Sequence, residues 1–174
     1  VRLIYHILTR SGYRGFLGGN IGMPLSEHVL AETEMDVLVL EISSFQLMLI
    51  RNFRPNTGVL LNISANHLDY HSDMQEYFRS KMRLFENQLP GDQALFPVWM
   101  KDQVEEMQGL CAQTNYFDST NKWDCPALIG PHNQENIQAA AMVCAQWGVT
   151  EKDVQSALGD FQPSPHRLEP VSEK

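Results

Sequence analysis

Two short segments of this chain are apolar almost throughout: residues 36–41 (DVLVLE) and 57–62 (TGVLLN). Runs of this length and composition are typical of β-strands buried on both faces, as in a parallel sheet covered by helices. Weaker strand patterns occur near 13–17, 93–96 and 114–117, with helical patterns between them. The sequence therefore predicts a three-layer α/β domain, with a mainly parallel sheet flanked by helices.

Several segments have helical spacing of apolar residues or carry capping residues. They are 3–8, 23–31, 74–89, 98–109, 133–147 and 150–158. Asn133 is expected to cap the alanine-rich helix, and Thr150 with Asp153 has the spacing of a capping box. Ser43 and Ser44 offer capping hydroxyls to a turn of helix after residue 41.

Composition excludes some classes of protein. The net charge of −8, without a basic run, argues against a nucleic-acid surface but leaves nucleotide binding open. The apolar runs are far too short for a membrane span, so no membrane partner is expected. Cys111, Cys125 and Cys144 lack metal-site spacing and are expected to be reduced thiols of a cytoplasmic protein.

A lysine lies on the apolar stripe of the helix predicted over 74–89. Met74, Tyr77, Phe78 and Phe85 recur at helical spacing, and Lys81 occupies the same face. The lysine stem can cover apolar surface while the amine reaches water. The amine can also contact a phosphate, or lose its charge through burial and be chemically modified, for example by CO₂ to a carbamate. The pattern leaves these alternatives open.

Polar side chains collect where the predicted strands end, and ligands bind at that edge of open parallel sheets. These residues are Asn20, Glu41, Ser43, Ser44, His67 and Asp69. Oxygen ligands with one imidazole suit Mg²⁺ or Mn²⁺ better than zinc. In the alternative interpretation, Glu41 is an ordinary strand-end acid and His67 bonds to backbone. His28 and His71 are expected to be solvated surface residues.

A second polar group lies at the start of the alanine-rich helix. Gly130-Pro131-His132-Asn133 forms a turn into the helix, and Asn136 follows one turn later. Amide side chains in such a place can bind an adenine edge, which pairs a donor with an acceptor. Simple capping by Asn133 is the alternative.

Six ordered motifs, covering nearly the whole chain, resemble those of the Mur ligase family. They are 18–22 (GGNIG), 40–47 (LEISSFQL), 62–69 (NISANHLD), 80–85 (SKMRLF), 130–136 (GPHNQEN) and 161–167 (FQPSPHR). The LEISSFQL block is most similar to that of the D-glutamate-adding members. The resemblance implies a P-loop NTPase-like central ATPase domain over 1–162, truncated at its N-terminus, and a linker over 163–174.

The resemblance also implies roles for the matched residues. Glu41 and His67 would ligate Mg²⁺, and a carbamylated Lys81 would hold or orient a second metal ion. Asn20 would line the phosphate and metal site. The remaining implied contacts are with the UDP-muramoyl substrate for Ser43 and Ser44, and with ATP for His132, Asn133, Asn136 and Arg167.

The implied reaction joins D-glutamate to UDP-N-acetylmuramoyl-L-alanine in peptidoglycan synthesis. ATP would phosphorylate the substrate carboxylate, and the amine would then attack the acyl phosphate. The full-length protein is expected to be a cytoplasmic monomer.

The family's phosphate loop, expected just before Val1, is not in the sequence, and Tyr70 stands where the family often has arginine. The chain alone is therefore expected to be inactive. Alternatives are another Mur ligase, a folylpolyglutamate synthetase relative, a non-catalytic nucleotide-binding scaffold and a metal-dependent hydrolase.

Overall fold

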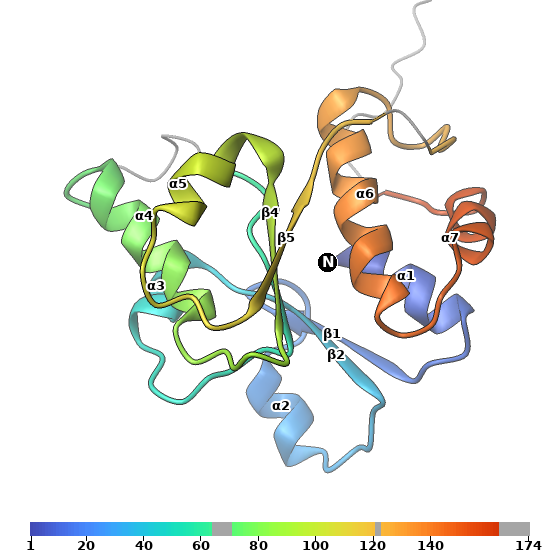
Figure 1. Ribbon diagram of the computed structural model, residues 1–174. Helices are drawn as coiled ribbons and strands as arrows, with labels where there is room; N and C mark the ends of the chain where they lie inside the picture. Colours follow the sequence, from blue (N-terminus) through green and yellow to red (C-terminus); the bar gives the residue numbers. More distant parts are fainter. Residues whose placement is uncertain (64–70, 121–122, 164–174) are drawn as a thin grey trace, which may run out of the picture.

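The computed structural model describes residues 1–63, 71–120 and 123–163. Helices and strands alternate along it, as the sequence predicts (Figure 1). The elements are α1 (Arg2–Arg10), β1 (Gly15–Gly19), α2 (Leu25–Leu30), β2 (Val37–Glu41), α3 (Ser44–Met48), β3 (Thr57–Val59), α4 (Met74–Met82), η1 (Arg83–Phe85), β4 (Gln93–Pro97), η2 (Val98–Met100), α5 (Lys101–Glu105), β5 (Gln113–Phe117), α6 (Pro131–Ala145) and α7 (Glu151–Leu158).

All strand pairing in the described part of the chain is parallel, but it forms two sheets rather than one. β1 pairs with β2 so that Gly19 lies opposite Glu41. The other sheet has the order β3-β4-β5. The prediction of parallel strands is confirmed, whereas the expected single sheet is divided between β2 and β3.

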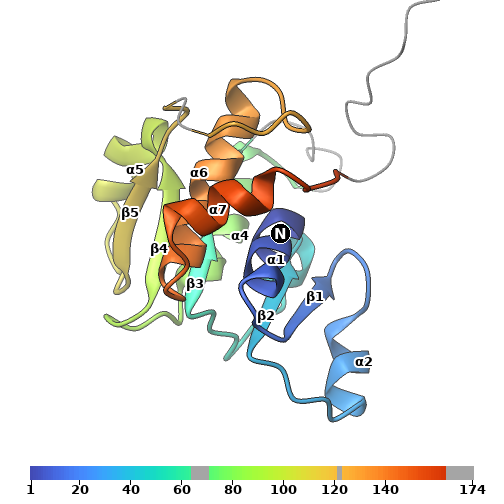
Figure 2. The ribbon, with the colours of Figure 1, turned by 90° about the vertical axis from the view of Figure 1, so that its right-hand side faces the viewer.

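Helices cover both faces of the β3-β4-β5 sheet, with α4 and α5 on one side and α6 on the other (Figures 1 and 2). Successive residues of β4 point to opposite faces. Ala94 and Phe96 therefore pack in a cluster with Met82 and Val104, whereas Leu95 packs with α6. This burial on both faces confirms the three-layer arrangement.

A separate core lies beside β1 and β2, where α1, α6 and α7 pack together (Figure 2). Ile7 and Leu8 of α1 and Ile137 of α6 are completely buried in it. The apolar stripe predicted at the start of the chain is therefore the face by which α1 enters the core. The capping box predicted at Thr150 and Asp153 is also present and starts α7.

Several local predictions need correction. Asn133 does not cap α6, because Gly130 is the N-cap with φ 99° and the helix begins at Pro131. The lysine-bearing helix ends at Met82 and continues only as one 3₁₀ turn. Met74, predicted to lie on the buried stripe, is 37% exposed.

The histidine predictions also change. His71 is not a solvated surface residue, because only 2% of it is exposed. His28 is half-buried and stacks on Phe16, with ring centroids 4.5 Å apart.

The thiol prediction is confirmed, since the three cysteines are free, with Cys111 exposed and the others buried. In the described ranges, no helix combines the length and apolar character that a membrane crossing needs.

Candidate functional site

Two glycines bring the loop after β1 against the end of β2. Gly19 has φ 104°, and a Cβ atom there would lie 2.3 Å from the Glu41 carbonyl oxygen. A Cβ atom on Gly18 would lie 2.1 Å from the carbonyl oxygen of Met23. Because no other residue fits so close to backbone, the glycines allow the Asn20 N–H to donate to the Glu41 carbonyl at 2.7 Å. Two residues predicted to share a site are thus adjacent.

The Glu41 carboxylate carries the clearest chemical signal at this corner. Its Oε2 atom is buried and has no hydrogen-bond partner among the residues that the structure describes. A buried carboxylate oxygen in this state is costly unless a cation or donor occupies the space beside it. The corner is therefore suited to bind a positively charged group.

Lys81 lies within electrostatic reach of Glu41. Burial lowers the pKa of the half-buried Lys81 amine, and the Glu41 carboxylate opposes this by raising it, with burial the larger effect. The amine also lies 5.8 Å from the ring centroid of Tyr77. Burial therefore makes the neutral form of the Lys81 amine more accessible than it is for an exposed lysine, and both the snorkelling and the modified-amine interpretations stay open.

The turn after β2 uses both predicted serines structurally. The Ser43 hydroxyl caps α3 by accepting from the Gln46 N–H at 3.3 Å, and the Gln46 side chain accepts from the Ser43 N–H at 2.9 Å. This capping box confirms the predicted N-cap. Ser44 is only 3% exposed, and its hydroxyl lies 3.0 Å from His71 Nε2.

The predicted adenine-binding residues lie on the first turns of α6. Asn133 is 6% exposed, and its Nδ2 donates to the Ile129 carbonyl at 2.8 Å. His132 is exposed and Asn136 is half-buried. The Asn133 side chain therefore fastens the turn before the helix, next to the exposed His132.

His67, Asp69, Tyr70 and Arg167 lie outside the described residues, so their predicted roles stay predictions. Among the residues that are described, no three His, Cys, Asp or Glu side chains gather as a metal site. The structure brings Asn20 and Glu41 together and places Lys81 in the field of Glu41.

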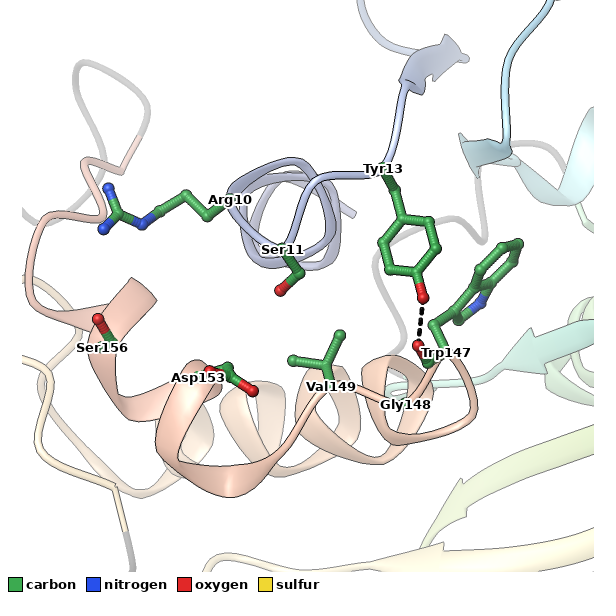
Figure 3. Close-up of a pocket in the computed structure, with 8 residues that line it drawn as sticks. All are labelled: Arg10, Ser11, Tyr13, Trp147, Gly148, Val149, Asp153 and Ser156. Carbon is green, nitrogen blue, oxygen red and sulfur yellow. Dashed lines mark hydrogen bonds between the residues drawn. The ribbon is translucent and has the colours of Figure 1, made fainter.

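Two cavities lie near these elements. One, of about 290 Å³, is lined by Gly19, Leu40, Ile42 and Gln46 among others and adjoins the candidate site. The other, of about 270 Å³, lies between the C-terminal ends of α1 and α6 and the start of α7 (Figure 3). Tyr13 donates there to the carbonyl of Trp147. That second cavity contains none of the predicted site residues.

Comparison with known proteins identifies the relatives of this chain. A ligase named UDP-N-acetylmuramoylalanine–D-glutamate ligase, from Oleidesulfovibrio alaskensis, is 48% identical over 99% of this chain and 39% of its own length. The protein of the same name from Nitratidesulfovibrio vulgaris strain Miyazaki F is 45% identical over the whole chain and 41% of its own length. The chain thus spans about two fifths of these relatives.

Solved structures share the fold. The MurF ligase from Thermotoga maritima, in complex with ADP, matches with a TM-score of 0.77 at 19% identity, over 99% of this chain and 48% of that one. MurF from Acinetobacter baumannii matches with a TM-score of 0.72 at 15% identity, over 99% of this chain and 45% of that one. The family model described as Mur ligase middle domain matches residues 1–124, more than half of the chain. The chain therefore belongs to the Mur ligase middle-domain family.

Proposed function

We propose that this chain is the central domain of an ATP-dependent ligase that joins D-glutamate to UDP-N-acetylmuramoyl-L-alanine in peptidoglycan synthesis. Relatives that are 45–48% identical to it bear the name of that ligase. Because the chain aligns with only 39–41% of each, the activity is proposed for the longer protein. An acyl phosphate, made from the substrate carboxylate and ATP, would be the species that the amine attacks.

The observation that carries this proposal is the buried Glu41 Oε2, which has no hydrogen-bond partner in the described part of the chain and lies within electrostatic reach of the Lys81 amine. A hard, anionic oxygen of this kind fits Mg²⁺. Glu41 would hold the ion, with His67 as a second ligand and Asn20 beside them. When bound, Mg²⁺ would neutralise phosphate charge at this corner.

Lys81 would act in a modified form. Its lowered pKa favours the neutral amine, which adds to CO₂ and releases one proton to give a carbamate. The carbamate would thus be an anion where a protonated lysine would be a cation, and two negative groups within electrostatic reach of each other would strengthen cation binding. The burial that lowers the pKa of Lys81 supports this role.

ATP would place its adenine at the start of α6. There the side-chain oxygen (Oδ1) of Asn133 would be the acceptor, and the side-chain NH₂ group of Asn136 the donor, that an adenine edge requires. The exposed His132 lies beside them, and Arg167 would contact the ribose or the phosphates. Ser43, at the half-buried surface of the α3 turn, is better placed for the UDP-muramoyl substrate than the buried Ser44.

The test is ADP release by the full-length enzyme, which should require both UDP-N-acetylmuramoyl-L-alanine and D-glutamate. Glu41→Gln removes the charge and keeps the shape, and it should lower kcat by about 10²–10³-fold. Glu105→Gln is the matched control, because Glu105 is exposed on α5 beside Lys101; this variant should behave as wild type. ADP release that does not depend on D-glutamate, or full activity of Glu41→Gln, would contradict the proposal.

A further inference from the structure

His71 is only 2% exposed, the least of the histidines that the structure describes, and the proposed chemistry gives it no role. It lies just before α4, two residues before Asp73, whose side chain caps that helix. Its Nε2 atom is 3.0 Å from the Ser44 hydroxyl. Its ring stacks on Phe45, with centroids 5.7 Å apart and planes 6° from parallel.

The same ring contacts the helix that carries Lys81. The His71 and Tyr77 centroids are 5.2 Å apart. Tyr77 is 4% exposed, and its ring in turn lies 5.8 Å from the Lys81 amine. His71 therefore contacts both the turn that follows Glu41 and Tyr77, the residue whose ring lies under the Lys81 amine.

These contacts fix direction as well as distance. An apolar side chain of similar size would fill the same space, but it would not form a hydrogen bond to Ser44 or a defined ring stack. Hydrogen bonds and aromatic pairs both have preferred angles, so together they restrict how α4 can rotate and slide against α3. Rigid support of this kind is what a reactive side chain needs to keep its place.

We infer that His71 is a positioning residue, which locks α4 to the turn after β2 and so keeps the Lys81 amine in its place over the Tyr77 ring. This inference rests on the proposed function, because it assigns His71 to the same site. It acts through Ser44 and Tyr77 and does not require His71 to touch a substrate.

The test uses the full-length enzyme with His71→Leu, which keeps apolar volume and removes the hydrogen bond. A displacement of the Lys81 amine by about 1 Å should lower kcat by about 10- to 100-fold, with KM for ATP within about twofold of wild type. His71→Gln places an amide near the Nε2 position and should recover part of kcat. Ser44→Ala should reproduce the loss, and the double variant Ser44→Ala/His71→Leu should be no worse than His71→Leu alone.

The matched control is His6→Leu. His6 is half-buried on α1, and its Nε2 lies 2.9 Å from the Ala157 carbonyl oxygen. Loss of this contact should lower the thermal midpoint but leave kcat per folded enzyme unchanged. If His71→Leu behaves like His6→Leu, or if His71→Gln recovers nothing, His71 is only structural and the inference is wrong.

Hydrogen exchange separates this inference from the proposed function. Amides of α4 should exchange faster in His71→Leu than in wild type, and they should not change in His6→Leu. Unchanged exchange at α4 would overturn the inference whatever the activity. Suppose that α4 exchanges faster in His71→Leu but that the wild-type protein releases no ADP. The first result would support the anchoring of α4 by His71, and the second would overturn only the ligase assignment.

Discussion

At the scale of single residues, burial of the charged Lys81 amine lowers the stability of the folded chain. Burial penalises its charged form, so its pKa is lower in the folded chain than the ordinary value of 10.5. A group of this kind costs stability wherever it is protonated in both states, below its folded pKa. The cost disappears as the pH rises from the folded pKa toward 10.5. The stability of the chain should therefore increase with pH across this window.

Lys81→Met tests this cost. In buffer freed of CO₂, where the amine is unmodified, the free energy of unfolding of the variant at pH 7 should be on the order of 1 kcal/mol higher than that of wild type, because an apolar side chain replaces a half-buried charge. The gain should shrink as the pH rises from the folded pKa and should be lost above 10.5, where the wild-type amine becomes neutral in both states. Urea unfolding at several pH values measures it.

The control for this prediction is Lys101→Met. Lys101 also lies near an aromatic ring, with its amine 5.9 Å from the Tyr116 centroid, but it is half-exposed and pairs with Glu105. No comparable gain is expected there. Equal gains in the two variants would mean that burial of Lys81 is not the cause.

The sequence predicts some of these residues well and others badly, for physical reasons. Helical spacing predicts that Lys81 lies on a buried face, and strand ends predict that Asn20 meets Glu41. Both follow from local geometry that repeats along the chain. His71 has no such signal, because its burial depends on Ser44 and Phe45, which are 27 and 26 positions away in the sequence.

At the scale of elements, the turn after β1 depends on glycine in a way that can be measured. Gly19 has φ 104° and its Cβ position meets the Glu41 carbonyl, whereas Gly12 has φ 93° and open space around its Cβ position. Gly12→Ala should therefore cost only the backbone strain, about 1–2 kcal/mol. Gly19→Ala should cost more, about 3 kcal/mol or above, because the end of β2 must also move.

Chemical denaturation of both variants measures this difference. In the full-length enzyme, Gly19→Ala should also lower ligase activity, since it displaces Glu41, while Gly12→Ala should not. Equal destabilisation by the two variants would show that the contact between a Cβ atom at position 19 and the Glu41 carbonyl costs no additional stability.

The entry to β4 is held by an ion pair that should respond to acid. Asp92 is 3% exposed and accepts from Arg54 Nε at 2.7 Å and Nη2 at 3.0 Å. The Arg54 side chain, and next the Leu89 N–H, hold the pKa of Asp92 below its usual 3.8. This stabilising contribution is present above pH 3.8 and is lost as the pH falls through the lower folded pKa.

Arg54→Gln should therefore lower the urea midpoint at pH 7 and weaken its fall between pH 4 and pH 2. Titration of the midpoint against pH in both proteins is the measurement. Arg14→Gln, which removes a more exposed pair with Asp36 at the starts of β1 and β2, is the comparison. An unchanged acid slope in Arg54→Gln would rule out the Arg54 contact as the origin of the shift.

Element boundaries were harder to predict than element types. The helix expected from Asn133 begins at Pro131, because proline is already suited to a first helical position and Gly130 adopts φ 99° before it. The strand expected over 57–62 pairs only over Thr57–Val59. Ends of this kind depend on which neighbour supplies hydrogen bonds, and periodicity within one segment does not report that.

At the scale of the whole molecule, α6 packs on both sides of the gap between the two sheets, because its residues lie in the core beside β1 and β2 and also against β4 and β5. One core lies around α1, α6 and α7, and another lies between the β3-β4-β5 sheet and α4 and α5. Between them is a small junction cluster formed by Leu95, Phe117, Ala139 and Val143. Since β2 and β3 do not pair in the described part of the chain, helices couple the two sheets, through this junction cluster on α6 and through the contact between α3 and α4.

A double-mutant cycle at the junction cluster measures that coupling. Leu95 is completely buried on β4, and Val143 is 7% exposed on α6. Leu95→Ala should cost about 2–5 kcal/mol, and the pair with Val143→Ala should depart from additivity by at least about 0.5 kcal/mol, because the two share one packing site. Leu95→Ala with Leu158→Ala of the α7 core should add within about 0.5 kcal/mol. If both pairs are additive, the junction cluster does not unite the two sheets. The same conclusion follows if wild type already unfolds in separate transitions that Leu95→Ala leaves unchanged, because the two sheets then unfold independently.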